Sequence, residues 1–100
     1  MKIVAPPHPG KTLLEDFMIP LGLSAHRLAT ELRIPATRIG DIIHGRRGVT
    51  ADTALRLARY FGTSAAFWMN LQMLYDLRTT ANERAPEIER DIRPRAMMHA

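Results

Sequence analysis

The feature of this sequence that most limits its fold is its helix punctuation, in which polar capping residues and glycines recur at short intervals. The only two serines, Ser24 and Ser64, each precede a helical pattern, and Thr50 does the same before a third. Side-chain oxygens at such positions accept hydrogen bonds from the free N–H groups of a first helical turn. Gly45 and Gly62 stand where a helix should end in a left-handed residue. The punctuation therefore predicts an all-α fold.

Five helices follow from these signals and from apolar residues spaced three and four apart. Their expected ranges are 9–18, 25–32, 36–44, 51–61 and 65–81. Pro20 and Gly22 are expected to end the first of them. Beyond the fifth helix the chain is polar and mixed in charge. We therefore expect a compact five-helix domain over residues 1–81 and a short C-terminal tail over residues 82–100.

Length, cysteine content and charge limit the classes of function. One hundred residues form one domain without room for a large catalytic cleft, and the absence of cysteine excludes disulfides, thiolate zinc sites and a cysteine nucleophile. The net charge of +4 arises within residues 1–81, because charges in the tail cancel. A basic balance suits a phosphate backbone, and it equally suits a solvated surface. No apolar run approaches the ~20 residues of a membrane span, and no signal-peptide core follows Lys2. We expect a cytoplasmic protein that does not enter membranes.

The joint between the second and third expected helices is very short, because Pro35 opens the third helix directly after Arg33 and Ile34. Two helices joined in this way are typical of a helix-turn-helix motif, in which a small residue on the first helix lets the second cross it closely. Ala29 is that small residue. On the third helix one face carries an apolar stripe, made by Ile39, Ile42 and Ile43. This stripe predicts which face of the recognition helix is buried.

The opposite face of the third helix, with the loop after it, is the predicted DNA-reading surface. Its small and hydrogen-bonding side chains suit insertion into a major groove, and the loop arginines can reach phosphates. Asp41 is the exception, since phosphates repel a carboxylate unless it accepts a hydrogen bond from cytosine N4 or pairs with Arg38. The predicted DNA-binding residues are Ala36, Thr37, Arg38, Gly40, Asp41, His44, Arg46 and Arg47.

Gly40 supports the same interpretation. A glycine inside a helix costs about 1 kcal/mol relative to alanine, and some other interaction usually compensates for it. Close approach of DNA is one such compensation, and close packing of another helix is the alternative. Because Gly40 lies about 100° from the isoleucine stripe, we favour DNA.

The fifth helix has apolar residues almost all the way round it, more than a five-helix domain can bury. We assign Phe67, Leu71 and Leu74 to the core. The predicted dimer interface consists of Trp68, Met69, Met73 and Leu77. Two-fold dimers of this class place their recognition helices about 34 Å apart, which matches the half-sites of a palindromic operator.

Further stretches extend the pattern, from Pro7-His8-Pro9-Gly10 through Ile43-His44-Gly45-Arg46-Arg47-Gly48 to Phe67-Trp68-Met69-Asn70-Leu71-Gln72. Over about residues 6–78 the chain resembles the HigA-type antitoxins of the Cro/repressor-like (XRE) helix-turn-helix class. The resemblance implies a repressor of its own operon that also neutralises a toxin, typically a ribosome-dependent endoribonuclease of the HigB/RelE kind. It also implies base contacts from Ala36, Thr37 and Asp41, with Arg38 near the backbone.

Two positions depart from the pattern of that class. The turn position that is commonly glycine is Arg33, which must accept a left-handed conformation or use a different turn. The position often held by a phosphate-binding glutamine is Ala25, so that contact is absent or comes from His26 or Arg27. We expect the motif to tolerate both changes.

An enzyme lacks the necessary parts, because the chain has no glycine-rich phosphate loop and no carboxylate pair at a useful spacing. The four histidines, at positions 8, 26, 44 and 99, do not form a metal-ligand pattern, so we expect neither a metal nor a cofactor. Two other functions stay open. One is a stand-alone repressor without a toxin, and the other is a toxin-binding adaptor with little DNA affinity.

Overall fold

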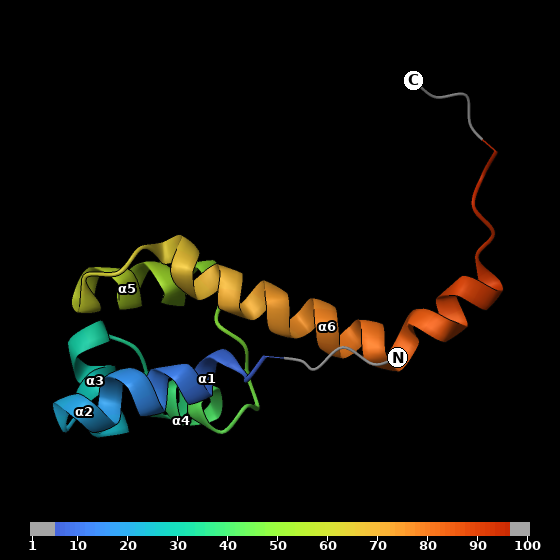
Figure 1. Ribbon diagram of the computed structural model, residues 1–100. Coiled ribbons are helices and arrows are strands. Elements are labelled where there is room, and N and C mark those ends of the chain that lie inside the picture. Colours follow the sequence, from blue (N-terminus) through green and yellow to red (C-terminus); the bar gives the residue numbers. More distant parts are fainter. Residues whose placement is uncertain (1–5, 97–100) are drawn as a thin grey trace.

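The computed structural model describes residues 6–96, which fold into five helical segments without a strand in that range (Figure 1). The first segment is one continuous run made of α1 (Pro9–Thr12), the π-helical stretch η1 (Leu13–Met18) and α2 (Ile19–Leu21). The other four are α3 (Ala25–Leu32), α4 (Ala36–Ile43), α5 (Ala51–Phe61) and α6 (Ala65–Asp91). The predicted all-α, five-helix class is confirmed. His99 and the last four residues of the predicted tail lie outside the described range.

The predicted caps account for the starts of α3, α5 and α6, and the predicted glycines account for the ends of α4 and α5. The side chains of Ser24, Thr50 and Ser64 each accept a hydrogen bond from the backbone N–H three residues later, at 3.0, 3.3 and 3.0 Å. Gly62 ends α5 with φ of 76°, and Gly45 follows α4 with φ of 74°. Each side-chain cap contributes about 1 kcal/mol to helix stability. Local signals are therefore sufficient to fix these boundaries.

Two helices run further than predicted. The first was expected to stop near Met18, but it continues through Pro20 to Leu21 and ends at Gly22, whose φ is 65°. A proline lacks an N–H and crowds the preceding turn, and the wider π-helical turn of η1 directly before it gives its ring room.

The last helix was expected to end at Ala81, but α6 continues to Asp91 with Pro86 inside it. Arg84 donates to Glu87 at 2.8 Å along the exposed surface of this extension. Good helix-forming residues surround the proline, and the polar composition reflects solvent exposure rather than irregular chain. The predicted end of the fifth helix was therefore wrong.

A small core joins the five segments. Its fully buried side chains are Leu13, Leu28, Ile39, Ile42, Ala54, Leu57 and Trp68. Ala29, the small residue predicted to let α4 cross closely, is buried on α3, and α3 packs against α4. Gly10 lets α1 meet α4 at backbone distance, because a Cβ built there would lie 1.8 Å from the carbonyl oxygen of Ile42. These contacts fix the position of α4 from two sides.

Only the N-terminal half of α6 packs on the rest of the molecule, against α5 and α1, while its C-terminal half projects beyond them (Figure 1). Within residues 6–96, none of the helices combines the length and the apolar character needed to span a membrane.

Candidate nucleic-acid interface

Helix α4 has the two faces that the sequence predicts for a recognition helix. Ile39 and Ile42 are fully buried and Ile43 is half-buried against the core. Thr37 and His44 are exposed, while Arg38 and Asp41 are half-buried. Ala36 is also half-buried and packs partly against the core, and its contact with DNA stays a prediction. The exposed face of α4 is thus narrow and made of short side chains.

Gly40 opens onto free space on this face. A Cβ built at Gly40 would meet nothing within 4 Å. Close packing of another helix, the alternative explanation for this glycine, is therefore wrong within the described chain. The close approach of DNA stays a prediction.

Asp41 pairs with a different arginine from the one predicted. Its Oδ1 accepts a hydrogen bond from Nε of Arg46 at 3.1 Å. The predicted partner, Arg38, instead lies 3.9 Å from the carboxylate of Asp52. The left-handed Gly45 turns the chain back over the end of α4, so the backbone N–H groups of Arg46 and Arg47 both reach the Asp41 carbonyl, at 2.8 and 3.2 Å. This fold of the loop brings Arg46 beside the carboxylate and leaves Arg47 exposed.

His44 closes the C-terminal end of α4. Its Nδ1–H donates to the carbonyl of Gly40 at 2.7 Å, and its backbone N–H donates to the same carbonyl at 3.1 Å. The Gly40 carbonyl thus accepts one hydrogen bond from the backbone and a second one from the imidazole ring, which strengthens the last turn of α4.

The turn between α3 and α4 takes the strained form that the sequence left open. Arg33 has φ of 62° and is the one non-glycine residue with positive φ in the described chain. A left-handed conformation costs such a residue about 1–2 kcal/mol. Arg56 of α5 compensates for part of this cost, because its Nη1 donates to the carbonyl of Leu32 at 2.8 Å. No local signal in the sequence indicates this contact of Arg56, because the two residues lie 24 positions apart.

At the start of α3, Ala25 packs partly against the core and presents no polar group. His26 and Arg27 are exposed there, and Arg27 pairs with Glu31 at 3.0 Å. A phosphate contact from either residue stays a prediction.

On α6 the four predicted interface residues separate. Trp68 is fully buried, donates from Nε1 to the Thr63 hydroxyl at 2.8 Å and packs on the ring of Phe17, so its placement on an exposed surface was wrong. The other three, Met69, Met73 and Leu77, are 36, 53 and 63 % exposed. Phe67, assigned to the core, is 37 % exposed. Apolar residues surround this helix, so hydrophobicity alone could not indicate which face is buried.

Two further residues, His8 and Gln72, stabilise the elements that carry the site. His8 caps α1 by accepting the Gly10 N–H at Nδ1 (2.9 Å), and its ring meets Tyr75 edge-on with centroids 4.9 Å apart. Burial lowers the pKa of His8, and the nearby Asp76 partly offsets this effect. Gln72 is buried on α6 and accepts a hydrogen bond from the N–H of Val49 at 2.7 Å. This bond anchors the end of the loop that carries Arg46 and Arg47. Among residues 6–96 there is no cluster of three or more His, Asp or Glu side chains that could hold a metal ion.

Helix α3 is followed by a tight turn, by α4 with one exposed face and by a basic loop. This arrangement defines the helix-turn-helix class. In agreement, residues 14–68 match the family profile described as Helix-turn-helix. Virulence-associated protein I of Dichelobacter nodosus is 49 % identical over 77 residues, which are 77 % of this chain and 71 % of that protein.

Two solved structures extend the similarity over nearly the whole chain. The Pseudomonas aeruginosa antitoxin HigA with the higBA promoter is 44 % identical, with a TM-score of 0.86 over 89 % of this chain and 97 % of that one. Antitoxin GraA in complex with its operator is 37 % identical, with a TM-score of 0.86 over 97 % of this chain and 98 % of that one. The chain belongs to the helix-turn-helix family and, within it, to the HigA-type group.

Proposed function

We propose that this protein binds operator DNA as a homodimer, represses its own operon and neutralises a partner RNase toxin of the HigB/RelE kind in the cytoplasm. The observation that carries the DNA part is the exposed face of α4, which is continuous with the loop of Arg46 and Arg47. Relatives with 44 and 37 % identity over at least 89 % of the chain have been solved with promoter or operator DNA, which supports the same function here.

On DNA, the first turns of α4 face the major groove and the loop follows the backbone. Thr37 and Asp41 offer hydrogen-bonding groups to base edges, with Ala36 and His44 at the margins of the same face. Gly40 lets the helix backbone approach closely. Arg46 and Arg47 bind phosphates, and Arg38 holds the backbone at the start of the helix.

The homodimer uses the exposed side of α6. Met69, Met73 and Leu77 follow one another at spacings of four residues along this helix, so their side chains share one face. Leu77 continues into a shallow groove of about 250 Å³ that is lined mainly by Ala81, Ala85 and Ile88. An apolar surface of this kind on a projecting helix is stabilised when a second copy covers it.

A toxin-binding adaptor with little DNA affinity is the second candidate. It is favoured by the pairing of Asp41 with Arg46 and by the partial burial of Ala36, which leave few long side chains for reading bases. A stand-alone repressor binds DNA as the antitoxin does and differs from the antitoxin only in having no toxin gene beside its own gene.

Fluorescence anisotropy tests these functions directly. The purified protein is titrated onto the duplex upstream of its own gene and onto a shuffled duplex of the same composition, each across a salt series. Binding that falls with salt and prefers the native duplex by about 10³-fold or more supports the repressor. Equal, weak binding to both duplexes supports the adaptor instead.

A further inference from the structure

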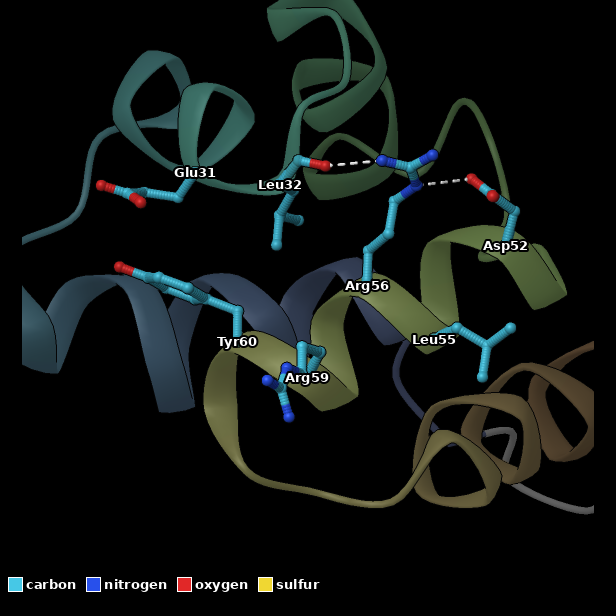
Figure 2. A pocket seen from close by; sticks show the side chains of 7 residues that line it. All are labelled: Glu31, Leu32, Asp52, Leu55, Arg56, Arg59 and Tyr60. Carbon is cyan, nitrogen blue, oxygen red and sulfur yellow. Dashed lines mark hydrogen bonds and ion pairs between the residues drawn. The ribbon is translucent and has the colours of Figure 1, made fainter.

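The turn between α3 and α4 is held from outside the motif by one side chain of α5. Figure 2 shows Arg56 reaching across to the carbonyl of Leu32, to which its Nη1 donates at 2.8 Å. The same nitrogen lies 3.5 Å from the carbonyl of Arg33. Carbonyls at the end of a helix lack intrahelical partners, so an external donor fixes them in place. The Arg56 guanidinium thereby connects α5 to the turn between α3 and α4, and this turn sets the direction of α4.

Asp52 extends this connection to α4 itself. Its Oδ2 accepts the Nε–H of Arg56 at 2.9 Å and lies 3.9 Å from Nη1 of Arg38, in the first turn of α4. An isolated exposed ion pair contributes little to stability, and Asp52 is 60 % exposed. These contacts act through geometry rather than through stability, because Arg56 contacts the turn and Asp52 contacts the recognition helix.

We propose that Arg56 and Asp52 are positioning residues that set the orientation of α4 and thereby the sequence selectivity of DNA binding. The inference rests on the proposed DNA-binding function. Base contacts require donor and acceptor atoms near 3 Å in a narrow range of angles, so a small rotation of α4 weakens them. Phosphate contacts from long, exposed arginines tolerate the same rotation. Loss of the positioning contacts therefore lowers selectivity more than it lowers general affinity for DNA.

Arg59 provides a matched control. It stands one turn after Arg56 on α5 and lines the same cavity of about 540 Å³ between α3 and α5 (Figure 2). Arg59 is exposed and forms no ion pair in the described part of the chain. Arg59→Met therefore removes the same charge from the same surface without removing a contact to the turn.

The test compares Arg56→Met with Arg59→Met by anisotropy on the native upstream duplex and its shuffled counterpart across a salt series. We expect Arg59→Met to keep the native-to-shuffled affinity ratio within about twofold of the parent. Arg56→Met should lower the ratio by about tenfold or more, with a salt slope equal to that of Arg59→Met. Equal ratios for the two variants overturn the proposal.

A second variant separates positioning from stability. Arg33→Gly removes the strain of the left-handed conformation at position 33, because glycine adopts a positive φ without cost. Adding Arg33→Gly to Arg56→Met therefore restores thermal stability without restoring the contacts of the guanidinium. The proposal predicts that the affinity ratio stays low while the melting temperature recovers. Recovery of the ratio together with the melting temperature overturns it. A parent protein that shows no preference for the native duplex overturns the proposed DNA-binding function itself, and this result is visible before any variant is made.

Discussion

The crossing of α1 over α4 depends on the absence of a side chain at Gly10. A Cβ at this position would lie 1.8 Å from the carbonyl oxygen of Ile42, whereas ordinary carbon–oxygen contacts begin near about 3.3 Å, so α1 would have to move away by about 1.5 Å. The obstacle is backbone, so no change of rotamer relieves it. The movement would pull apart the core that begins at Leu13, one turn further along the same helical run.

Gly10→Ala is therefore expected to lower the free energy of unfolding by about 3 kcal/mol, the upper end of the usual cost of overpacking. For a domain of this size the melting temperature falls by about 10 °C or more. Gly40→Ala is the matched control, because the same methyl group there enters open space on a helix. This control should gain about 0.5–1 kcal/mol, since alanine restricts the unfolded chain and favours the helix.

Thermal unfolding followed by far-ultraviolet circular dichroism measures both variants against the parent. The two substitutions are chemically identical, so opposite signs can only come from their surroundings. A Gly10→Ala protein that melts within about 2 °C of the parent would show that α1 and α4 do not meet at backbone distance.

Three further predictions concern DNA binding, assembly and pH. Replacing Arg46 and Arg47 together by alanine should weaken binding to all duplexes and flatten the salt slope by about two units per protomer. Thr37→Ala should instead act mainly on sequence preference. Anisotropy across a salt series distinguishes the two variants, and an unchanged slope for the double arginine variant contradicts the assignment of these arginines to phosphates. Leu77→Glu should give monomers by light scattering, while a glutamate at the equally exposed Leu55 of α5 should leave the dimer intact. Burial lowers the pKa of His8, so the imidazole binds a proton more readily in the unfolded state than in the folded state. The free energy of unfolding should therefore fall as pH drops below about 6.5. His8→Asn should lose part of this dependence when melting temperatures are compared on either side of that pH.

The features that the sequence predicted are those set by neighbouring residues. Ser24, Thr50 and Ser64 act as caps because each bonds a backbone group only three residues away. The isoleucine stripe of α4 and the small Ala29 follow from helical periodicity, which any chain of this pattern obeys. Helix-turn-helix topology was accessible because a very short joint leaves few arrangements of two helices.

The features that the sequence missed depend on distant parts of the chain. Arg56 binds carbonyls 23 and 24 residues away, and its role is invisible until α5 packs beside α3. Trp68 occupies the core because α6 meets α5 along one face, which a helix with apolar residues all round does not indicate. Asp41 was matched to Arg38 by helical spacing, but the left-handed turn at Gly45 brought Arg46 closer.

Gln72 connects α6 to the loop that carries Arg46 and Arg47. Gln72 of α6 accepts the N–H of Val49 at 2.7 Å and donates from Nε2 to Asp76 at 2.9 Å, so its amide is held at both ends. A Cβ built at Gly48 would lie 2.9 Å from the same amide, so the loop backbone rests directly on this side chain. A buried N–H that loses its acceptor costs about 1–3 kcal/mol, which makes separation of the loop from α6 unfavourable. If α6 joins two copies as proposed, the spacing between the two recognition helices is transmitted through Gln72 rather than through a flexible linker.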